Sequence, residues 1–235
     1  MKTIFEFFII AALALCLSGN AWAEPPIRIV VYGDSLMGAY QMQPEEAFPA
    51  RLDQKLKKVG FSNVEVINMS ASNQTTADAL DRLNSVLSLH PDIVILELGT
   101  DDALNGIGIN VIYKNLGAIL QTLAQNKVYT IIIGNKAPAR MGSGYNTQFK
   151  EIYRRLAEAF ALPFYPFALA GVAGNPDLNM ADGIHPNAKG AEIMTDQIYP
   201  LVDAAVRWEF EVQQQQEQWR QQNQAPFPDA APATD

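Results

Sequence analysis

Short apolar runs alternate along the chain with longer stretches in which apolar residues recur three and four positions apart. The short runs have the length and composition of buried strands, and the longer stretches have the period of amphipathic helices. Strands are expected over residues 27–32, 64–68, 93–98, 129–134 and 163–167. Helices are expected over residues 45–59, 75–89, 110–126, 146–160 and 187–207.

This alternation predicts an α/β fold. Strands that are apolar throughout, rather than at every second position, are typical of a parallel sheet buried on both faces. We therefore expect a three-layer α/β/α sandwich around a five-stranded parallel sheet. Length and the absence of a composition shift favour one domain, residues 24–207. Residues 208–235, glutamine-rich and then Pro/Ala-rich, form a tail that either extends the last helix or is partly disordered.

The first 23 residues are predicted to be an export signal. Lys2 precedes an apolar run over residues 4–17, and Ala21-Trp22-Ala23 has the A-x-A pattern of a cleavage site. Cleavage after Ala23 would place the mature protein in the periplasm or outside the cell. The run is too short to span a bilayer comfortably, so we expect no stable membrane anchor. Lipid attachment through Cys16, the single cysteine, is the alternative.

Charge and composition narrow the partners. The net charge is -8, and no basic cluster stands out, which disfavours nucleic acid. Histidine, cysteine and carboxylate residues are not clustered at metal-ligand spacing, and no glycine loop resembles a phosphate cradle. We therefore expect no metal and no cofactor, and a small molecule as substrate.

Polar residues follow the predicted strands, where an open parallel sheet binds its ligands. Ser35 follows the first strand, Asn73 the second and Asp101 the third, while Asp182 and His185 precede the last helix. These side chains are expected to converge on one edge of the sheet.

Only one of the two histidines can act there. His90 precedes the third strand and is expected at the opposite edge, which leaves His185 as the candidate base. A serine hydroxyl needs a neighbouring base to become a nucleophile, and the base needs a third group to hold its tautomer. Asp182 is close enough in sequence to orient His185, so the set predicts nucleophilic catalysis by Ser35.

At these residues the sequence resembles the SGNH, or GDSL, hydrolases of the bacterial arylesterase and lysophospholipase/thioesterase type. Gly33-Asp34-Ser35-Leu36 is similar to the first family block, residues 68–76 to the second, residues 97–102 to the third and residues 182–187 to the last. The resemblance covers about residues 27–206 and implies a flavodoxin-like sheet. It also implies Ser35 as nucleophile, His185 as general base and then acid, and Asp182 as its orienting group.

The resemblance further implies an oxyanion hole built from the Ser35 backbone N–H, a glycine N–H of the second block and an asparagine side chain of the third. Asn73 stands at the glycine position and Asp101 at the asparagine position. Losing one donor costs roughly a hundred- to a thousandfold in turnover. An ionised Asp101 about 4 Å from the oxyanion adds a repulsion of about 4 kcal/mol at an effective dielectric constant near 20.

Two compensations are available. Burial can keep Asp101 protonated, so that it donates a hydrogen bond. Alternatively, the Asn73 carboxamide replaces the missing donor, and from the sequence we favour this second hypothesis.

Apolar residues next to the site segments are the candidate acyl-binding residues, and residues 135–145 are the candidate border of the cleft. These residues are Met37, Leu104, Ile107, Met141 and Ile184. The expected function is an exported serine hydrolase that cleaves short acyl or aryl esters, thioesters or lysophospholipid-like esters. The alternatives are a weakly active or inactive relative that binds ligands, and an esterase acting on O-acetyl groups of polysaccharide.

Overall fold

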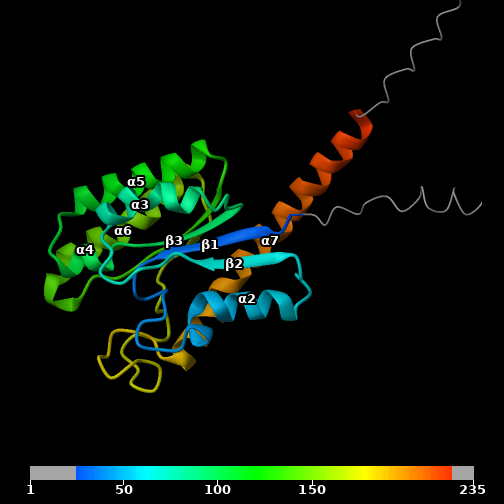
Figure 1. The fold of residues 1–235 in the computed structure, drawn as a ribbon. Coiled ribbons are helices and arrows are strands. Elements are labelled where there is room, and N and C mark those ends of the chain that lie inside the picture. Colours follow the sequence, from blue (N-terminus) through cyan, green and yellow to red (C-terminus); the bar gives the residue numbers. More distant parts are fainter. Residues whose placement is uncertain (1–24, 224–235) are drawn as a thin grey trace, which may run out of the picture.

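The computed structural model describes residues 25–223. Within this range the strands form one parallel sheet in the order β2-β1-β3-β4-β5 (Figure 1). They are β1 (Ile27–Gly33), β2 (Val64–Asn68), β3 (Ile93–Glu97), β4 (Tyr129–Ile133) and β5 (Phe164–Tyr165). The predicted five-stranded parallel sheet is therefore confirmed, and its order is that of a flavodoxin-like sheet.

Helices cover both faces of the sheet. They are α2 (Phe48–Lys58), α3 (Thr76–Leu87), α4 (Thr100–Leu104), α5 (Ile109–Gln125), α6 (Gly142–Phe160) and α7 (Ala188–Asn223), with short 3-10 turns η1 (Pro44–Glu46) and η2 (Ala139–Met141). In Figure 1, α3, α5 and α6 lie on one face and α2 with α7 on the other, which gives the expected three layers.

Each face has its own apolar core because successive strand side chains point to opposite sides of the sheet. Val30 of β1 packs with residues of α3, α5 and α6, such as Leu116. The next residue, Val31, packs with residues of α2 and α7, such as Leu52 and Met194. Continuous apolar strands were therefore the correct signal for a sheet buried on both sides.

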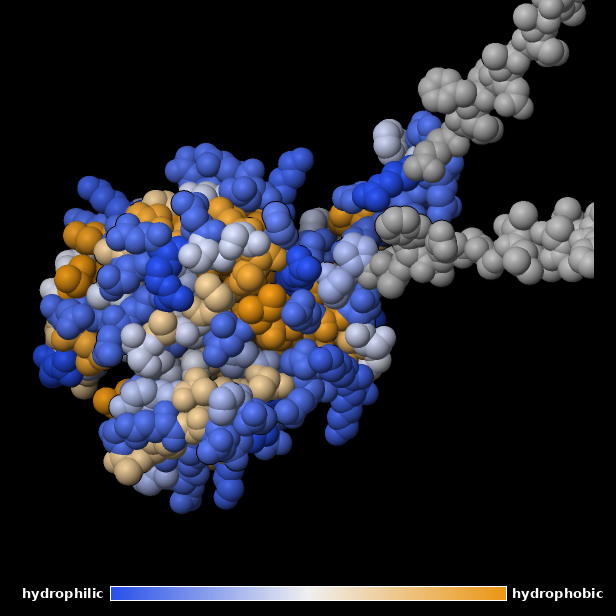
Figure 2. Space-filling view, in the orientation of Figure 1, coloured by the Kyte–Doolittle hydropathy of each residue, from blue (hydrophilic) through white to orange (hydrophobic). Residues whose placement is uncertain are grey.

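The last helix differs most from the prediction. It was expected to end at residue 207, but α7 continues through the glutamine-rich segment to Asn223. Glutamine is a good helix former, so the segment needs no apolar face to continue the helix. Its C-terminal end projects from the body in Figure 1 and is largely hydrophilic in Figure 2.

The predicted signal segment, the lipid-attachment alternative at Cys16 and the Pro/Ala-rich end lie outside the described residues. Among residues 25–223, no helix has the length and apolar character needed to cross a bilayer.

Candidate active site

A tight turn after β1 places Ser35 at the carboxyl edge of the sheet. The Asp34 carbonyl oxygen accepts hydrogen bonds from the backbone N–H groups of Met37 and Gly38, and Asp34 Oδ1 accepts one from the Leu36 N–H at 3.0 Å. Gly33 is required because a Cβ atom there would lie 2.9 Å from the Glu97 carboxyl group. The close approach of β3 thus permits only glycine just before the turn.

The turn rests on a buried polar cluster that the sequence analysis missed. The Asp34 backbone N–H donates to the Glu97 carbonyl oxygen at 3.2 Å and to Glu97 Oε2 at 3.3 Å. Asn135 Nδ2 donates to Glu97 Oε1. The three residues lie at the ends of β1, β3 and β4, and all are fully buried. The cluster therefore ties three strand ends together beneath Ser35.

Burial decides the protonation of this cluster. Burial is the main cause that raises the pKa of Glu97 well above its usual range, and the charge of Asp34 adds to the effect. Burial likewise raises the pKa of Asp34 to about 7. Two neighbouring carboxyl groups without water resist double ionisation, so at least one keeps its proton near neutral pH.

The segment between β5 and α7, residues 166–187, is held firmly although it has little regular structure. Asn179 Nδ2 donates to the carbonyl oxygens of Val172 at 2.6 Å and Asn175 at 2.7 Å. Asn187 caps the start of α7, because its side-chain oxygen accepts two backbone N–H groups of the first turn. The residues between these two asparagines are therefore anchored at both ends.

Within this segment, Asp182 and His185 meet Ser35. Ser35 Oγ lies 2.8 Å from His185 Nε2, and His185 Nδ1 lies 2.7 Å from Asp182 Oδ2. Asp182 Oδ1 accepts the backbone N–H groups of Ile184 at 2.9 Å and His185 at 3.0 Å. Burial raises the pKa of Asp182, but these hydrogen bonds outweigh it and hold the pKa below its ordinary value. Asp182 is therefore an acceptor that orients the imidazole.

Tyr40, which the sequence analysis did not single out, covers one face of that imidazole. Its ring is stacked on the His185 ring, with centroids 3.8 Å apart and an interplanar angle of 20°. Gln41 Nε2 donates to the Tyr40 hydroxyl oxygen at 3.1 Å. The stack limits rotation of the imidazole and shields its face from water.

Asp101 and Asp102 begin α4 beside this group. The Asp102 carboxylate accepts the Thr76 backbone N–H at 2.7 Å and the Thr76 hydroxyl at 2.6 Å. Asp101 is 8% exposed, and its Oδ2 is buried with no hydrogen-bond partner among residues 25–223. Burial raises the pKa of Asp101, and the neighbouring charge of Asp102 raises it further.

Asn73 lies at the surface of the loop after β2. Its backbone has φ 58°, in the left-handed region that glycine and asparagine adopt at low cost. An asparagine can therefore occupy a position where the resemblance implies glycine. Its carboxamide makes no hydrogen bond within the described part of the chain, and its role as a substitute donor stays a prediction.

Three of the candidate acyl-binding residues come together. Leu104 and Ile107 follow α4, and Met141 lies in the loop before α6. Arg140 Nη2 donates to the Leu104 carbonyl oxygen at 3.2 Å, and the Tyr145 hydroxyl donates to the Ile107 carbonyl oxygen at 2.8 Å. The loop over residues 135–145 therefore packs against the α4–α5 connection, where both can border a cleft.

The other two candidates lie elsewhere. Ile184 is 47% exposed on the His185 loop. Met37 has no exposed surface and packs in the α2/α7 core, so it supports the Ser35 turn instead of lining an open cleft.

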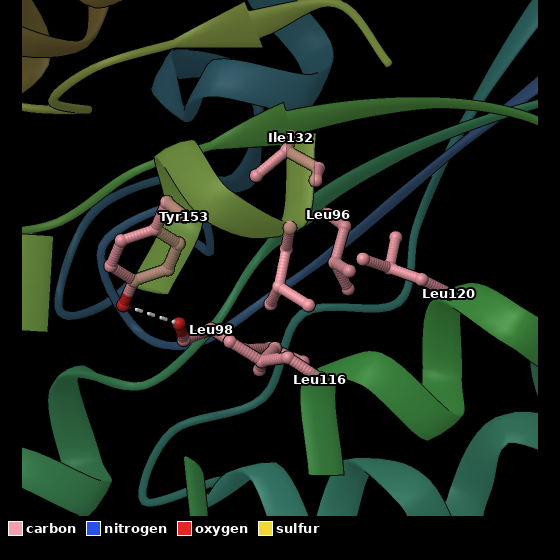
Figure 3. A pocket seen from close by; sticks show the side chains of 7 residues that line it. Leu96, Leu98, Leu116, Leu120, Ile132 and Tyr153 are labelled. Atoms are coloured by element: carbon pink, nitrogen blue, oxygen red, sulfur yellow. Dashed lines mark hydrogen bonds between the residues drawn. The ribbon is translucent and has the colours of Figure 1, made fainter. Parts of the chain in front are cut away.

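An apolar cavity beside α5 and α6 is separate from this site (Figure 3). It is lined by Leu96, Leu98, Leu116, Leu120, Ile132, Tyr153 and Leu156. Its volume of about 10 Å³ holds no acyl chain. The Tyr153 hydroxyl donates to the Leu98 carbonyl oxygen at 2.9 Å, so the one polar tip among these side chains is satisfied.

Among the described residues, no group of three or more histidine, cysteine or acidic side chains could hold a metal ion. The chemistry available at the site is that of the serine, the imidazole and the carboxyl groups.

The sequence profile of the GDSL-like lipase/acylhydrolase family matches residues 31–193. This chain belongs to that family. The match contains the Ser35 turn, both oxyanion-hole positions and the Asp182–His185 loop, and it places the protein in the esterase class.

Relatives agree with this assignment. The chain is 36% identical over 175 residues to an arylesterase of Vibrio mimicus, covering 74% of this chain and 86% of that protein. It is 34% identical over 180 residues to the thioesterase 1/protease 1/lysophospholipase L1 of Escherichia coli K12, covering 74% and 85%. The structure of the psychrotrophic esterase EstA from Pseudoalteromonas sp., inhibited by monoethylphosphonate, superposes with a TM-score of 0.72 at 28% identity, covering 77% and 99%.

Proposed function

We propose that this esterase is a serine hydrolase that works through an acyl-enzyme on Ser35. The observation that carries the proposal is the continuous chain of contacts from Ser35 Oγ to His185 at 2.8 Å and from His185 to Asp182 at 2.7 Å. Because an ionised carboxylate only accepts hydrogen bonds, Asp182 holds the proton on Nδ1 and leaves Nε2 free to accept the serine proton.

The proposed reaction has two halves. In the first, Ser35 Oγ attacks the carbonyl carbon while His185 Nε2 takes its proton, and His185 then returns that proton to the departing alcohol or thiol. In the second, His185 takes a proton from water, the hydroxide oxygen attacks the acyl carbon, and the carboxylic acid leaves as Ser35 recovers its proton. Asp182 stabilises the imidazolium in both halves.

The proposed substrates are short acyl or aryl esters, thioesters and lysophospholipid-like esters. The apolar group of Leu104, Ile107 and Met141 supports this class, since it offers an apolar surface to an acyl or aryl group. The names of the relatives, an arylesterase and a thioesterase/lysophospholipase, support it as well. We also propose that the protein is exported, and this rests on the pattern of residues 1–23.

One observation favours a second candidate, a nearly inactive relative that only binds its ligand. Asp101 stands where the family resemblance implies a neutral donor, and an ionised carboxylate there would oppose the oxyanion.

Labelling with a fluorophosphonate probe separates the two candidates, because such probes react with an activated serine. The experiment uses the protein without residues 1–23, assays aryl and acyl esters of graded length, and takes Ser35→Ala as control. We expect labelling and hydrolysis that Ser35→Ala abolishes. Absence of both in the wild type would exclude the serine-hydrolase mechanism, and activity on acetyl groups of glycans alone would change the substrate class.

A further inference from the structure

We propose that Asp101 is a catalytic residue that works as a neutral acid, donating a hydrogen bond from its carboxyl O–H to the oxyanion formed when Ser35 attacks. This inference rests on the proposed function and names the missing donor of its oxyanion hole.

The sheet order places Asp101 beside the nucleophile. β1 and β3 are adjacent, with Gly33 paired to Glu97, and the sheet order reverses between them. Ser35 and Asp101 leave the carboxyl ends of these two strands. The Asp101 carboxyl group is close enough to interact electrostatically with His185 and with Asp34. It therefore faces the same space as the reacting group.

The hydrogen bonds of Asp101 are complete except where a donor would be needed. The Gln74 backbone N–H hydrogen-bonds to its carboxyl group. Oδ2 is buried without a partner in the described part of the chain. An asparagine here would accept the same N–H with its oxygen and present an N–H from the other side of its side chain. A protonated carboxyl group presents an O–H in the same way, whereas a carboxylate leaves a bare buried oxygen at a high desolvation cost.

The surroundings of Asp101 favour the neutral form. Asp102 on α4 and Asp78 on α3 place negative charge near it, and Asp34 adds a third carboxyl group from the end of β1. His185 is the one titratable group whose positive form opposes them. Arg82 on α3 does not neutralise the site directly, since its guanidinium donates to the Gln74 side-chain oxygen.

The Asn73 carboxamide is the competing donor. Asn73 is exposed and makes no hydrogen bond that holds its side chain toward Ser35 in the described structure. A mobile surface amide must lose conformational freedom in each turnover, whereas Asp101 is already fixed by burial. The structure thus reverses the preference that the sequence suggested.

Neutral Asp101 gives the reaction a defined pH dependence. His185 must be unprotonated to accept the serine proton, so activity rises with pH on the acid side. The Asp101 donor is present below its raised pKa and is lost as pH rises through that value. Activity therefore falls again on the alkaline side, and this limb belongs to Asp101.

The test compares kcat/KM for a short aryl ester as a function of pH in the wild type, Asp101→Asn and Asp101→Ala. Asp101→Asn keeps a donor that does not titrate, so it should remove the alkaline limb and exceed the wild type by about tenfold for each pH unit above it. Asp101→Ala should lower kcat/KM by roughly a hundred- to a thousandfold at the wild-type optimum. A wild-type profile without an alkaline limb, or a limb that persists in Asp101→Asn, would overturn the proposal. So would a large loss in Asn73→Gly with none in Asp101→Ala.

A second readout does not depend on turnover. The Asp101 carboxyl carbon is followed by 13C NMR during a pH titration of the Ser35→Ala variant, with Asp101→Asn used to assign the signal. We expect this carboxyl group to ionise at a higher pH than the exposed aspartates. Ionisation together with the exposed aspartates would refute the neutral acid, even if no ester is hydrolysed. Complete absence of Ser35-dependent hydrolysis with a high Asp101 transition would instead contradict only the proposed function.

Discussion

The Tyr40 ring lies flat on the imidazole of His185, with ring centroids 3.8 Å apart. The two residues come from loops that are distant in sequence, and neither stacking partner is part of a helix or strand. An electron-rich face against the ring favours the imidazolium that forms when Ser35 loses its proton. Tyr40 is therefore a positioning residue that acts through His185.

Replacing Tyr40 tests this role. Tyr40→Leu should lower kcat about tenfold, because an interaction of this type contributes about 1 kcal/mol when it is partly shielded from water. It should also shift the acid limb of the pH profile to higher pH, because more of the histidine must be kept neutral without the shielding ring only if the ring had disfavoured charge; a shift to lower pH is expected if the ring stabilises the cation, as we propose. We therefore expect a shift to lower pH.

Tyr40→Phe is the matched control, since it keeps the ring and loses only the hydroxyl that Gln41 contacts. It should retain most of the wild-type activity and the wild-type acid limb. Equal losses in Tyr40→Phe and Tyr40→Leu would assign the effect to the hydroxyl group and contradict the stacking role.

The buried pair of Glu97 and Asp34 should make stability depend on pH. Burial raises the pKa of both groups, that of Asp34 to about 7. A raised folded-state pKa contributes stability that is fully present below the unfolded-state pKa and is lost as pH rises through the folded value. From about pH 4 to pH 7, each proton held only by the folded state removes up to about 1.4 kcal/mol from the free energy of unfolding per pH unit.

Glu97→Gln should weaken this dependence, because its amide imitates the protonated acid and does not titrate. Urea unfolding at pH 5 and pH 8 measures the difference. We expect the variant to gain stability relative to the wild type on going from pH 5 to pH 8. A difference between the two proteins that stays constant over this range would rule out titration of the pair as its cause.

Gly190 should be essential for the His185 loop. A Cβ atom at this position would lie 2.2 Å from the Leu178 carbonyl oxygen and 2.9 Å from the Val172 side chain. Gly190→Ala should therefore push the loop away from α7, destabilise the protein by about 1–3 kcal/mol and lower esterase activity. Gly144→Ala, in α6 with nothing within 4 Å of the new Cβ, is the control and should stabilise the fold slightly. Similar thermal unfolding of the two variants would show that the loop yields without cost.

The projecting end of α7 should contribute little to the fold. Trp208 packs on Tyr129 and Phe210 on Phe61, with ring centroids 5.1 and 5.8 Å apart, whereas residues 214–223 are exposed. A chain that ends at residue 213 should unfold within about 0.5 kcal/mol of the full chain. A chain that ends at residue 207 loses both aromatic contacts and should be less stable by about 2 kcal/mol or more. Equal stability of the two truncated chains would show that the domain ends at residue 207.

Local patterns were sufficient for the fold and for the central site residues. The apolar runs predicted every strand because a buried parallel strand must be apolar on both faces. Ser35, Asp182 and His185 could be singled out because each follows or precedes a regular element at the ligand-binding edge of the sheet. The short helix α4 was missed, since its few residues show no period, and the end of α7 was misplaced because glutamine continues a helix without an apolar pattern.

Contacts between distant segments were decided by the tertiary structure alone. Nothing in the sequence near Tyr40 indicates that it would cover His185, and nothing near Glu97 indicates that it would lie under the Ser35 turn with Asn135. Met37 is adjacent to the site in sequence, yet the turn directs it into the core.

Asp101 shows the division most clearly. The sequence by itself determined that an acid stands where the family resemblance implies an amide, and that this acid follows a strand next to Ser35. Only the tertiary structure decided that the acid is buried, that Oδ2 has no partner among the described residues and that other carboxyl groups surround it. Residue type is a local property, whereas the protonation of a carboxyl group depends on the water and charge that the folded chain places around it.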